Sequence, residues 1–300
     1  MDDINCATTK IPDFWTPVSD PASRDSSTHF PLDDINLDTV SNETLIALLE
    51  TAPILHKLGG TAVVRLSQNL VLKGGTSVLP SEAENMKLVA ESTNIRLPTV
   101  YRSFNTADPN GGYYQTRGYI VMDYIHGDCL ADRWAHLTHD QRENVVFQIA
   151  NMVNQLQSHP LDFAGPVGGG PCQGMWFSDY GAGPFKNCDA IEEWFNHKLS
   201  VCKRFRQIPD SAPPFVFKRF VFTHQDITPR NIVIDPLGQA WLIDWAFSGS
   251  YPEVFEAAAI ARQHQFQDFG QLLLQHIPFE AEKVVQLKSI IYGLTTAALA

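Results

Sequence analysis

Three oxygen-bearing side chains occur at fixed spacing around residue 230. Asp226 is followed five residues later by Asn231, and Asp244 comes thirteen residues after Asn231. The strand-like runs 231–235 and 240–244 are joined by a turn, so they predict an antiparallel hairpin. Asn231 opens the first strand of this hairpin and Asp244 ends the second, which would place their side chains next to each other.

Such a group suits magnesium-dependent chemistry. One carboxylate and one amide oxygen form the oxygen-only site that Mg²⁺ prefers. Asp226 would lie close by and act as a base. Asp and Asn are also ordinary turn residues, and each one alone is better explained by a turn. The three spacings together, each in a suitable strand or loop, favour a functional site.

The elements expected before this segment are mainly strands. The runs 61–67 and 69–75 are rich in Val and Leu and predict a tight antiparallel hairpin. Residues 81–93 predict a helix whose start shows the capping-box pattern in Ser81 and Glu84. A sheet with one helix would therefore precede the polar segment.

The pattern changes after Gly127, where the apolar strand-like run 118–127 ends. Beyond it the sequence predicts helix over residues 130–159, with a break near Thr138, and then a long loop rich in Gly and Pro over 160–189. A further helix is predicted over 190–205, and the chain from residue 252 onward is also predicted to be helical. We therefore expect an α+β protein with a sheet-rich front and a helical body.

The polar segments resemble those of a known superfamily. THQDITPRNIVID (223–235) and WLIDWAFSG (241–249) are similar to the catalytic loop and metal-binding Asp of protein-kinase-like phosphotransferases. Trp245 after Asp244, and the string YPEVFE (251–256), resemble the aminoglycoside phosphotransferase and choline kinase branch, including its fungal members. The resemblance covers about residues 45–260.

This resemblance implies a bilobal protein-kinase-like fold. We expect an N-terminal arm over residues 1–40, an N-lobe that binds the nucleotide over 41–125, and a C-lobe with the catalytic loop, metal site and substrate site over 126–300. The N-lobe would have an antiparallel sheet with one key helix, and the C-lobe would be mainly helical.

The resemblance also implies roles in the N-lobe. Lys73, inside the strand-like run 69–75, would grip the nucleotide phosphates, with Glu84 as its ion-pair partner and Glu82 as the alternative. Glu84 is also expected in the capping box, which would occupy its carboxylate.

The adenine would meet backbone groups near Asp123, Tyr124 and Ile125. The sequence departs from the kinase pattern in having no G-x-G-x-x-G. The pair Gly59–Gly60 falls where a turn covering the phosphates belongs, although Gly-Gly is also a generic loop signal.

The implied reaction is transfer of the γ-phosphoryl group of ATP or GTP to a hydroxyl of a small molecule. Asn231 and Asp244 would bind Mg²⁺, and Asp226 would align the acceptor hydroxyl. His224 would hold the loop by packing and hydrogen bonding. Arg230 could face a phosphate, although a solvated side chain is the simpler expectation.

The acceptor is less defined, and a cationic one is an option. Its amine would need acidic groups, for which Asp179, Asp189, Glu192, Glu193, Glu253 and Glu256 are candidates. Trp176, Trp194 and Trp245 could stack on a sugar or hold a quaternary ammonium. Such residues are more often a solvated helix face or part of the core.

Composition limits the other partners. The 300 residues carry a formal net charge of −11, which argues against a binder of nucleic-acid backbones. No apolar run is long enough to span a membrane. The five cysteines show neither disulfide-scaffold nor zinc-site spacing, so a reducing compartment, the cytoplasm, is expected.

Two alternatives remain at this point. A catalytically weak nucleotide-binding protein of the same fold would explain the missing Gly-rich loop, but not the joint presence of Lys73, Asp226, Asn231 and Asp244. An unrelated Mg²⁺-dependent hydrolase would leave Lys73 and the helix after it unexplained.

Overall fold

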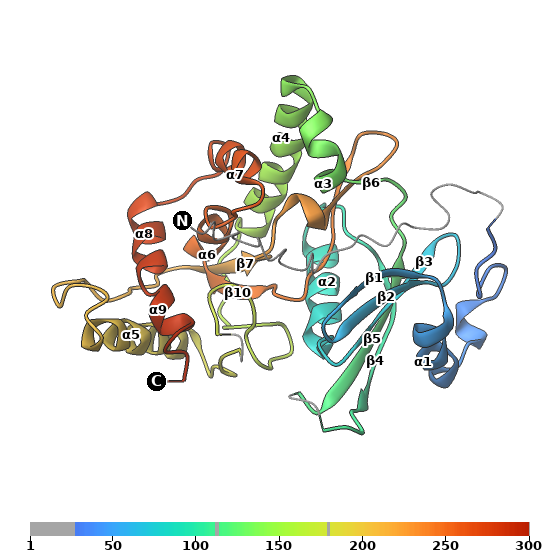
Figure 1. The fold of residues 1–300 in the computed structure, drawn as a ribbon, viewed down its shortest axis with the longest axis horizontal. Coiled ribbons are helices and arrows are strands. Elements are labelled where there is room, and N and C mark those ends of the chain that lie inside the picture. Colours follow the sequence, from blue (N-terminus) through green and yellow to red (C-terminus); the bar gives the residue numbers. More distant parts are fainter. Residues whose placement is uncertain (1–27, 112–113, 179–180, 300) are drawn as a thin grey trace, which may run out of the picture.

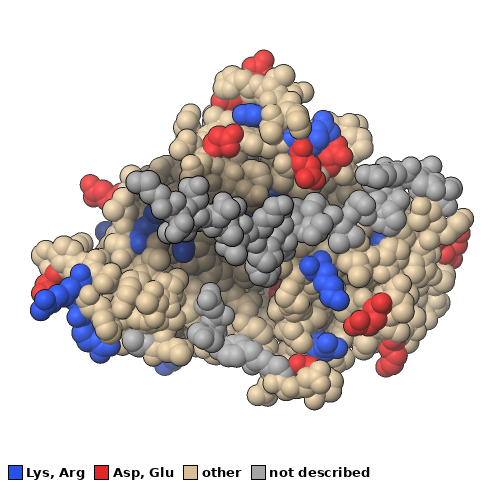
Figure 2. All heavy atoms as spheres, in the orientation of Figure 1, with Lys and Arg blue, Asp and Glu red and all other residues tan. Residues whose placement is uncertain are grey.

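The computed structural model describes residues 28–111, 114–178 and 181–299. Within these residues the chain forms a sheet-rich lobe and a mainly helical lobe, seen on the right and left of Figure 1. The surface is hollowed between the two lobes (Figure 2). This arrangement confirms the predicted α+β, bilobal fold class.

The N-lobe is built on a five-stranded antiparallel sheet in the order β1-β2-β3-β5-β4. Its strands are β1 Ile54–Leu58, β2 Thr61–Arg65, β3 Leu70–Gly75, β4 Val100–Ala107 and β5 Thr116–Asp123. The predicted hairpin is the pair β2 and β3. Strands β1 and β4 were not predicted. β4 is an edge strand in which most residues of YRSFNTA are polar, so it lacks a continuous apolar run.

One face of the sheet packs against the start of the described chain. Ser41 caps helix α1 (Asn42–Thr51), and the buried Leu45 of that helix joins a core with Val64, Leu72 and Val121. Leu32 and Val40, which the sequence assigned to the arm, belong to the same core. Residues 28–40 therefore pack on the lobe, and residues 1–27 of the predicted arm lie outside the described part.

Helix α2 (Pro80–Ser92) lies between the sheet and the C-lobe (Figure 1). It begins one residue before the predicted start, with Leu79 at the N-cap and Pro80 in the first turn. The predicted capping box is wrong because proline fixes φ and has no N–H to satisfy, so it suits the first helical position. Ser81 and Glu84 consequently lie inside the helix.

The C-lobe combines helices with two small sheets, of order β6-β8-β9 and β10-β7. Its elements are β6 Asp128–Cys129, α3 Leu130–Arg133, α4 His139–Leu156, α5 Cys188–Arg204, β7 Phe220–Thr223, β8 Ile232–Ile234, β9 Ala240–Leu242, β10 Gly249–Pro252, α6 Val254–Ile260, α7 Gln267–Leu274, α8 Ala281–Ser289 and α9 Ile291–Leu294. The predicted helix break is confirmed, because Thr138 caps α4 with a complete capping box.

The small sheets position the polar segment. Strand β7 leads into the loop with Asp226, and β8 and β9 form the predicted hairpin. The N–H of Ile243 donates to the carbonyl of Asn231 at 3.0 Å, which extends the hairpin toward Asp244. All seven residues of α6 are buried beneath this region, so the loops rest on a packed base.

Candidate active site

Lys73 and Asp244 bring the two lobes together. The Lys73 Nζ donates to Asp244 Oδ1 at 2.7 Å and to Glu82 Oε1 at 2.6 Å. Lys73 is only 5% exposed. Burial by itself would lower its pKa, but the charges of Asp244 and Glu82 outweigh burial and raise it. The ammonium is therefore a fixed positive charge at the junction of β3, α2 and the β9 end.

The ion-pair partner of Lys73 is Glu82, so the expectation of Glu84 is wrong. Two residues along a helix are about 200° apart around its axis. Glu82 consequently faces the sheet and is buried, whereas Glu84 faces solvent and pairs with Lys87 at 2.8 Å. The alternative named from the sequence is the one that the helix geometry selects.

Asp244 follows β9 in a left-handed backbone conformation, with φ 63°. Its side chain is 45% exposed, so part of the carboxylate faces the space between the lobes. Burial favours the neutral acid, but the nearby Lys73 ammonium outweighs it and holds the pKa of Asp244 below its usual range. Asp244 is thus a preset negative charge.

Asp226 and Asn231 are joined by hydrogen bonds. The Asn231 Nδ2 donates to the Asp226 carbonyl at 2.9 Å and to Asp226 Oδ2 at 2.8 Å. Burial and the charge of Asp244 raise the pKa of Asp226 to about 6, while Asn231 and Arg230 oppose the rise. Asp226 is therefore mainly ionised at pH 7 and close enough to neutrality to exchange a proton.

A buried carboxylate supports this loop from below. Glu256 accepts hydrogen bonds from the backbone N–H groups of His224 and Gln225. Burial raises the pKa of Glu256 to about 7. Gln225 has φ 66°, a strained conformation for a residue with a side chain, and such strain needs surrounding support. Glu256, expected from the sequence as a candidate for binding an amine, therefore positions this loop instead.

His224 holds the loop as expected. Its Nδ1 accepts from the Asp226 N–H at 3.2 Å, and its Nε2 lies 3.2 Å from the Ile243 carbonyl. The first bond needs an unprotonated Nδ1 and the second needs a protonated Nε2, which together define the neutral ring. Burial lowers the pKa of His224 to about 4.

The donor set fits a magnesium ion carried by a nucleotide. Asn231 donates to Asp226 through Nδ2, so its Oδ1 is the oxygen that it could offer to a metal, and the Asp244 side chain is 45% exposed. The described residues contain no group of three or more His, Cys, Asp or Glu that could hold a metal ion alone. Magnesium usually binds proteins through one or two side chains and takes its other ligands from phosphates and water.

The Gly59–Gly60 pair forms the tight turn between β1 and β2. Gly59 has φ +55°, and a Cβ on Gly60 would lie 2.4 Å from Thr76 Oγ1 and 2.5 Å from Ser77 Oγ. Both positions therefore favour glycine. The turn is much shorter than a G-x-G-x-x-G loop, and its contact with a phosphate stays a prediction.

The segment that links the two lobes already uses several of its hydrogen-bonding groups within the protein. The N–H groups of Asp123 and Tyr124 donate to the carbonyls of Thr99 and Asn69. The Asp123 carboxylate accepts from the Thr99 N–H and the Tyr101 hydroxyl. Contact of these donors with an adenine would require them to leave these partners, and the predicted adenine contacts stay a prediction.

Two residues near the site were missed. His56 of β1 lies opposite Val63, which lies opposite Lys73, so the three side chains share one face of the sheet. Burial lowers the pKa of His56, and Asp244 is near enough to oppose this. Asn85 of α2 donates to the Ser248 carbonyl and accepts from the Val167 N–H, which fixes α2 to the C-lobe. No local signal in the sequence indicates either contact.

The residues expected around an amine are mostly engaged elsewhere. Trp176 and Trp245 are completely buried, and Trp194 packs among Phe177, Phe185 and Phe195. Glu192 accepts from the Phe217 N–H, and Glu253 pairs with Arg219. Asp189 and Glu193 are exposed on α5, and Asp179 lies outside the described residues.

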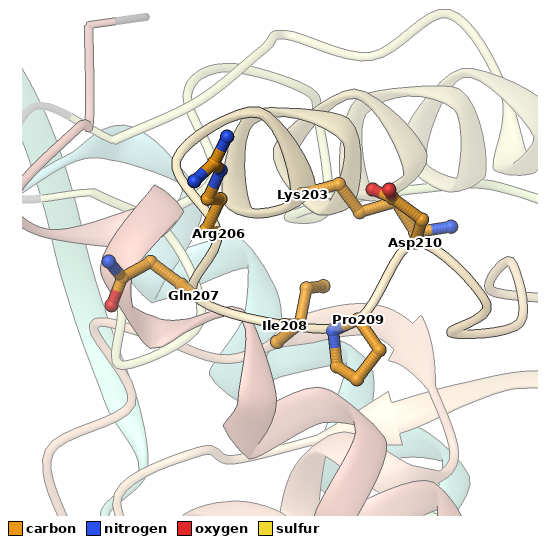
Figure 3. Close-up of a pocket in the computed structure, with 6 residues that line it drawn as sticks. All are labelled: Lys203, Arg206, Gln207, Ile208, Pro209 and Asp210. Carbon is orange, nitrogen blue, oxygen red and sulfur yellow. The ribbon is translucent and has the colours of Figure 1, made fainter.

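Some cavities of the structure lie away from the candidate active site. One of about 430 Å³ lies at the end of α5, lined by Lys203 and by residues 206–210 (Figure 3). There the Lys203 ammonium donates to the Ala212 carbonyl at 2.7 Å. Another of about 940 Å³ lies beside Tyr124, the start of α4 and the β8–β9 turn. Neither contains Lys73, Asp226 or Asp244.

A two-lobed fold with a lysine–glutamate pair, a catalytic-type loop and an aspartate after a hairpin defines the protein-kinase-like class of phosphotransferases. The model of the phosphotransferase enzyme family matches residues 57–277, and the chain belongs to this family. It is therefore an enzyme, with the fold of small-molecule kinases. No curated protein sequence matches the chain.

Solved structures of aminoglycoside phosphotransferases share the fold. ADP-bound APH(2'')-Ib has 14% identity and a TM-score of 0.53, over 83% of this chain and 86% of that one. The streptomycin–ATP–APH(2")-IIa complex has 15% identity and a TM-score of 0.52, over 85% and 94%. A thermostable APH(4)-Ia mutant with ADP and hygromycin B has 14% identity and a TM-score of 0.52, over 85% and 89%.

Proposed function

We propose that the protein transfers the γ-phosphoryl group of ATP or GTP to a hydroxyl group of a small molecule. The observation that carries this proposal is the convergence of Lys73 and Glu82 from one lobe with Asp244 from the other, beside the hydrogen-bonded pair of Asp226 and Asn231. Nucleotides in the solved structures of similar fold support the choice of co-substrate.

Each residue has a defined role in this reaction. Lys73, held by Glu82, contacts the nucleotide phosphates. Asn231 and Asp244 would hold Mg²⁺, which when bound would neutralise charge on the phosphates. Asp226 accepts a hydrogen bond from the acceptor hydroxyl and aligns it for in-line attack. The turn Gly59–Gly60 covers the phosphates, and the adenine lies against the segment Asp123–Ile125.

The transfer replaces one phosphorus–oxygen bond by another. The acceptor oxygen forms a bond to the γ-phosphorus, and the bond from that phosphorus to the bridging oxygen breaks. The nucleoside diphosphate leaves, and the hydroxyl proton passes to Asp226. A carboxyl with a pKa of about 6 is ionised at pH 7 and can take this proton.

A second candidate is a catalytically weak nucleotide-binding protein. The two-residue turn Gly59–Gly60 favours it, since a short turn has fewer N–H groups for phosphates than a Gly-rich loop has. The fixed positions of Lys73, Asp226 and Asp244 favour the enzyme, because a protein that only bound nucleotide would not need a base beside the metal ligands.

Thermal unfolding with and without Mg·ATP and Mg·GTP tests the proposal, on the wild type, Asp244→Ala and the exposed control Asp140→Ala. A ligand at 100 times its Kd stabilises by about 2.7 kcal/mol. We expect the wild type and the control to shift only with Mg²⁺, and Asp244→Ala not to shift. A shift that ignores Mg²⁺ and Asp244 favours the second candidate, and no shift at all rejects both.

For the domain limits we propose those expected from the sequence, an arm over residues 1–40, an N-lobe over 41–125 and a C-lobe over 126–300.

The four described cysteines form no disulfide, which supports a location in a reducing compartment, the cytoplasm. No helix in the described ranges is long and apolar enough to cross a membrane. The formal net charge of −11 supports a small-molecule partner over nucleic acid.

A further inference from the structure

Asn85 is a buried residue of α2 that follows Glu82 by three positions, so the two are neighbours on the helix surface. The Asn85 side chain is 0% exposed. Its Nδ2 donates to the Ser248 carbonyl at 2.8 Å, and its Oδ1 accepts from the Val167 N–H at 2.9 Å. The helix that holds Lys73 through Glu82 is therefore also bound to two loops of the other lobe.

Ser248 closes the turn that follows the proposed metal ligand Asp244. The Ser248 N–H and hydroxyl both donate to the Trp245 carbonyl, at 3.2 Å and 2.6 Å. Ser248 is 1% exposed and Trp245 is 0% exposed, so this turn belongs to the core. Asp244 has φ 63°, and a residue with a side chain keeps such a conformation where surrounding contacts hold it. The bond from Asn85 holds the far end of this turn.

The loop that carries Asp226 binds the same turn. Gln225, the residue before Asp226, is 1% exposed and donates from Nε2 to the Phe247 carbonyl at 2.8 Å. The neighbouring carbonyls of Phe247 and Ser248 are thus held by side-chain amides from two different segments. The turn 245–248 consequently connects the helix that carries Glu82 with the loop that carries Asp226.

These bonds close a ring of contacts around the pair of Lys73 and Asp244. The Lys73 ammonium reaches Asp244 and Glu82, and Asn85 joins α2 back to the segment after Asp244. Apolar residues of α2 also join the C-lobe core, but apolar packing is not directional. Hydrogen bonds are directional, so the two bonds of Asn85 fix the rotation of α2 relative to the turn.

Resting on the proposed function, we infer that Asn85 is a positioning residue for phosphoryl transfer, because its bond to Ser248 keeps Asp244 where the carboxylate meets Lys73 and would bind Mg²⁺. It acts through the turn 245–248. Its removal should therefore weaken the response to Mg²⁺ more than the binding of nucleotide without Mg²⁺. A residue that only stabilised the fold would affect both alike.

The test compares Asn85→Ala with a matched loss of two hydrogen bonds elsewhere. The Asn196 side chain of α5 also binds one carbonyl and one N–H: its Nδ2 donates to the Phe215 carbonyl at 3.0 Å, and its Oδ1 accepts from the Phe215 N–H at 2.8 Å. Helix α5 lies apart from α2 (Figure 1). Asn196→Ala is therefore the control. Asn85→Leu and Asn196→Leu form a second pair, which keeps the branched shape of the side chain if the alanine variant fails to fold.

Thermal unfolding with ATP or GTP at a fixed concentration is followed as Mg²⁺ increases, and the Kd for each nucleotide is also measured in EDTA. Asn85→Ala should need about tenfold more Mg²⁺ for half of the full shift, while the Kd in EDTA stays within about twofold. Exchange of the backbone amide hydrogens of residues 244–249, measured without nucleotide, should become faster. The Asn196 variants should match the wild type in all three measurements, even where their free energy of unfolding falls as far.

The outcomes separate this inference from the proposed function. A wild type that neither Mg·ATP nor Mg·GTP stabilises rejects the proposed function, and this inference with it. A wild type that responds, with an Mg²⁺ requirement that the Asn85 variants do not change, overturns the inference alone. An equal change in the Asn196 variants, or unchanged exchange of residues 244–249, also overturns it.

Discussion

The buried and the exposed charges around Asp226 are held in opposite ways. Between the lobes, the buried Lys73 contacts two carboxylates, Glu82 and Asp244, from two other segments. In the loop after Asp226, Arg230 is exposed and bound to a neutral amide. The buried charges have fixed partners because an unpaired buried charge is costly, whereas an exposed guanidinium can exchange one weak partner for another.

This difference separates charges that are fixed from charges that can change partner. Phosphoryl transfer depends on charges that are in position before the reaction, so its groups are paired. We therefore expect substitutions of the paired charges between the lobes to reduce the rate and the stability together, and substitutions of exposed charges to have little effect on stability.

The largest effect on the rate is expected from a substitution of Asp226. Asp226→Asn keeps the shape of the side chain and removes the base, so kcat should fall by roughly 100- to 10,000-fold. The thermal shift with Mg·ATP should remain, because Asp226 is not proposed to bind nucleotide. Steady-state kinetics and the shift are measured on the same preparation. A loss of less than tenfold in kcat would contradict the role of Asp226.

Two glutamates of α2, one buried and one exposed, test how much the ion pair of Lys73 contributes. Glu82→Gln leaves the buried Lys73 with one carboxylate, and we expect a loss of about 3 kcal/mol in the free energy of unfolding with weaker nucleotide binding. Glu84→Gln removes only an exposed pair with Lys87 and should cost less than about 0.5 kcal/mol. Urea unfolding and nucleotide titration measure both. Equal losses would show that the buried pair is not needed.

These two glutamates also show what the sequence can predict. The hairpin of Asn231 and Asp244, and Lys73 inside a strand, follow from short apolar runs and a turn, which are local patterns. The choice between Glu82 and Glu84 depends on the rotation of α2, which Pro80 and the packing of the helix on the sheet determine. One residue of error at the helix start is enough to select the wrong face.

Contacts between distant segments were beyond prediction. Glu256 supports a loop 31 residues earlier, and Asn85 reaches Ser248 across 163 residues. In the sequence, a buried acid that binds backbone N–H groups cannot be distinguished from an acid that faces a ligand. For this reason the acidic residues offered as an amine site, within the described part of the chain, proved to be structural or exposed elsewhere.

The pH dependence of stability tests how firmly the loop beneath Asp226 is held. The pKa of His224 falls from 6.5 to about 4 on burial, so between these values the unfolded chain binds a proton that the folded protein does not. Stability from this group is therefore complete above pH 6.5 and lost as the pH falls toward 4, by about 3 kcal/mol.

His224→Gln removes the titration and retains a donor for the Ile243 carbonyl. The pKa of Glu256, raised to about 7, acts in the opposite direction as the pH falls, and the difference between wild type and variant cancels it. We expect this difference in the free energy of unfolding to change by about 3 kcal/mol between pH 7 and pH 4. A constant difference would mean that the His224 ring is not held in its neutral form.

The smallest effect concerns the turn over the phosphates. Gly59→Ala strains a residue with φ +55° by about 1 kcal/mol, but the new methyl group meets no atom within 4 Å. Gly60→Ala places a Cβ against Thr76 Oγ1 and Ser77 Oγ, so either these side chains or the turn must shift. If the turn covers the phosphates, Gly60→Ala should raise the Kd for Mg·ATP several-fold, and Gly59→Ala less than twofold. Removing both hydroxyls, with Thr76→Ala and Ser77→Ala, should restore binding to Gly60→Ala. Equal affinities for the two single variants would mean that the nucleotide does not touch the turn, and Lys73 would then be the main phosphate contact from the N-lobe.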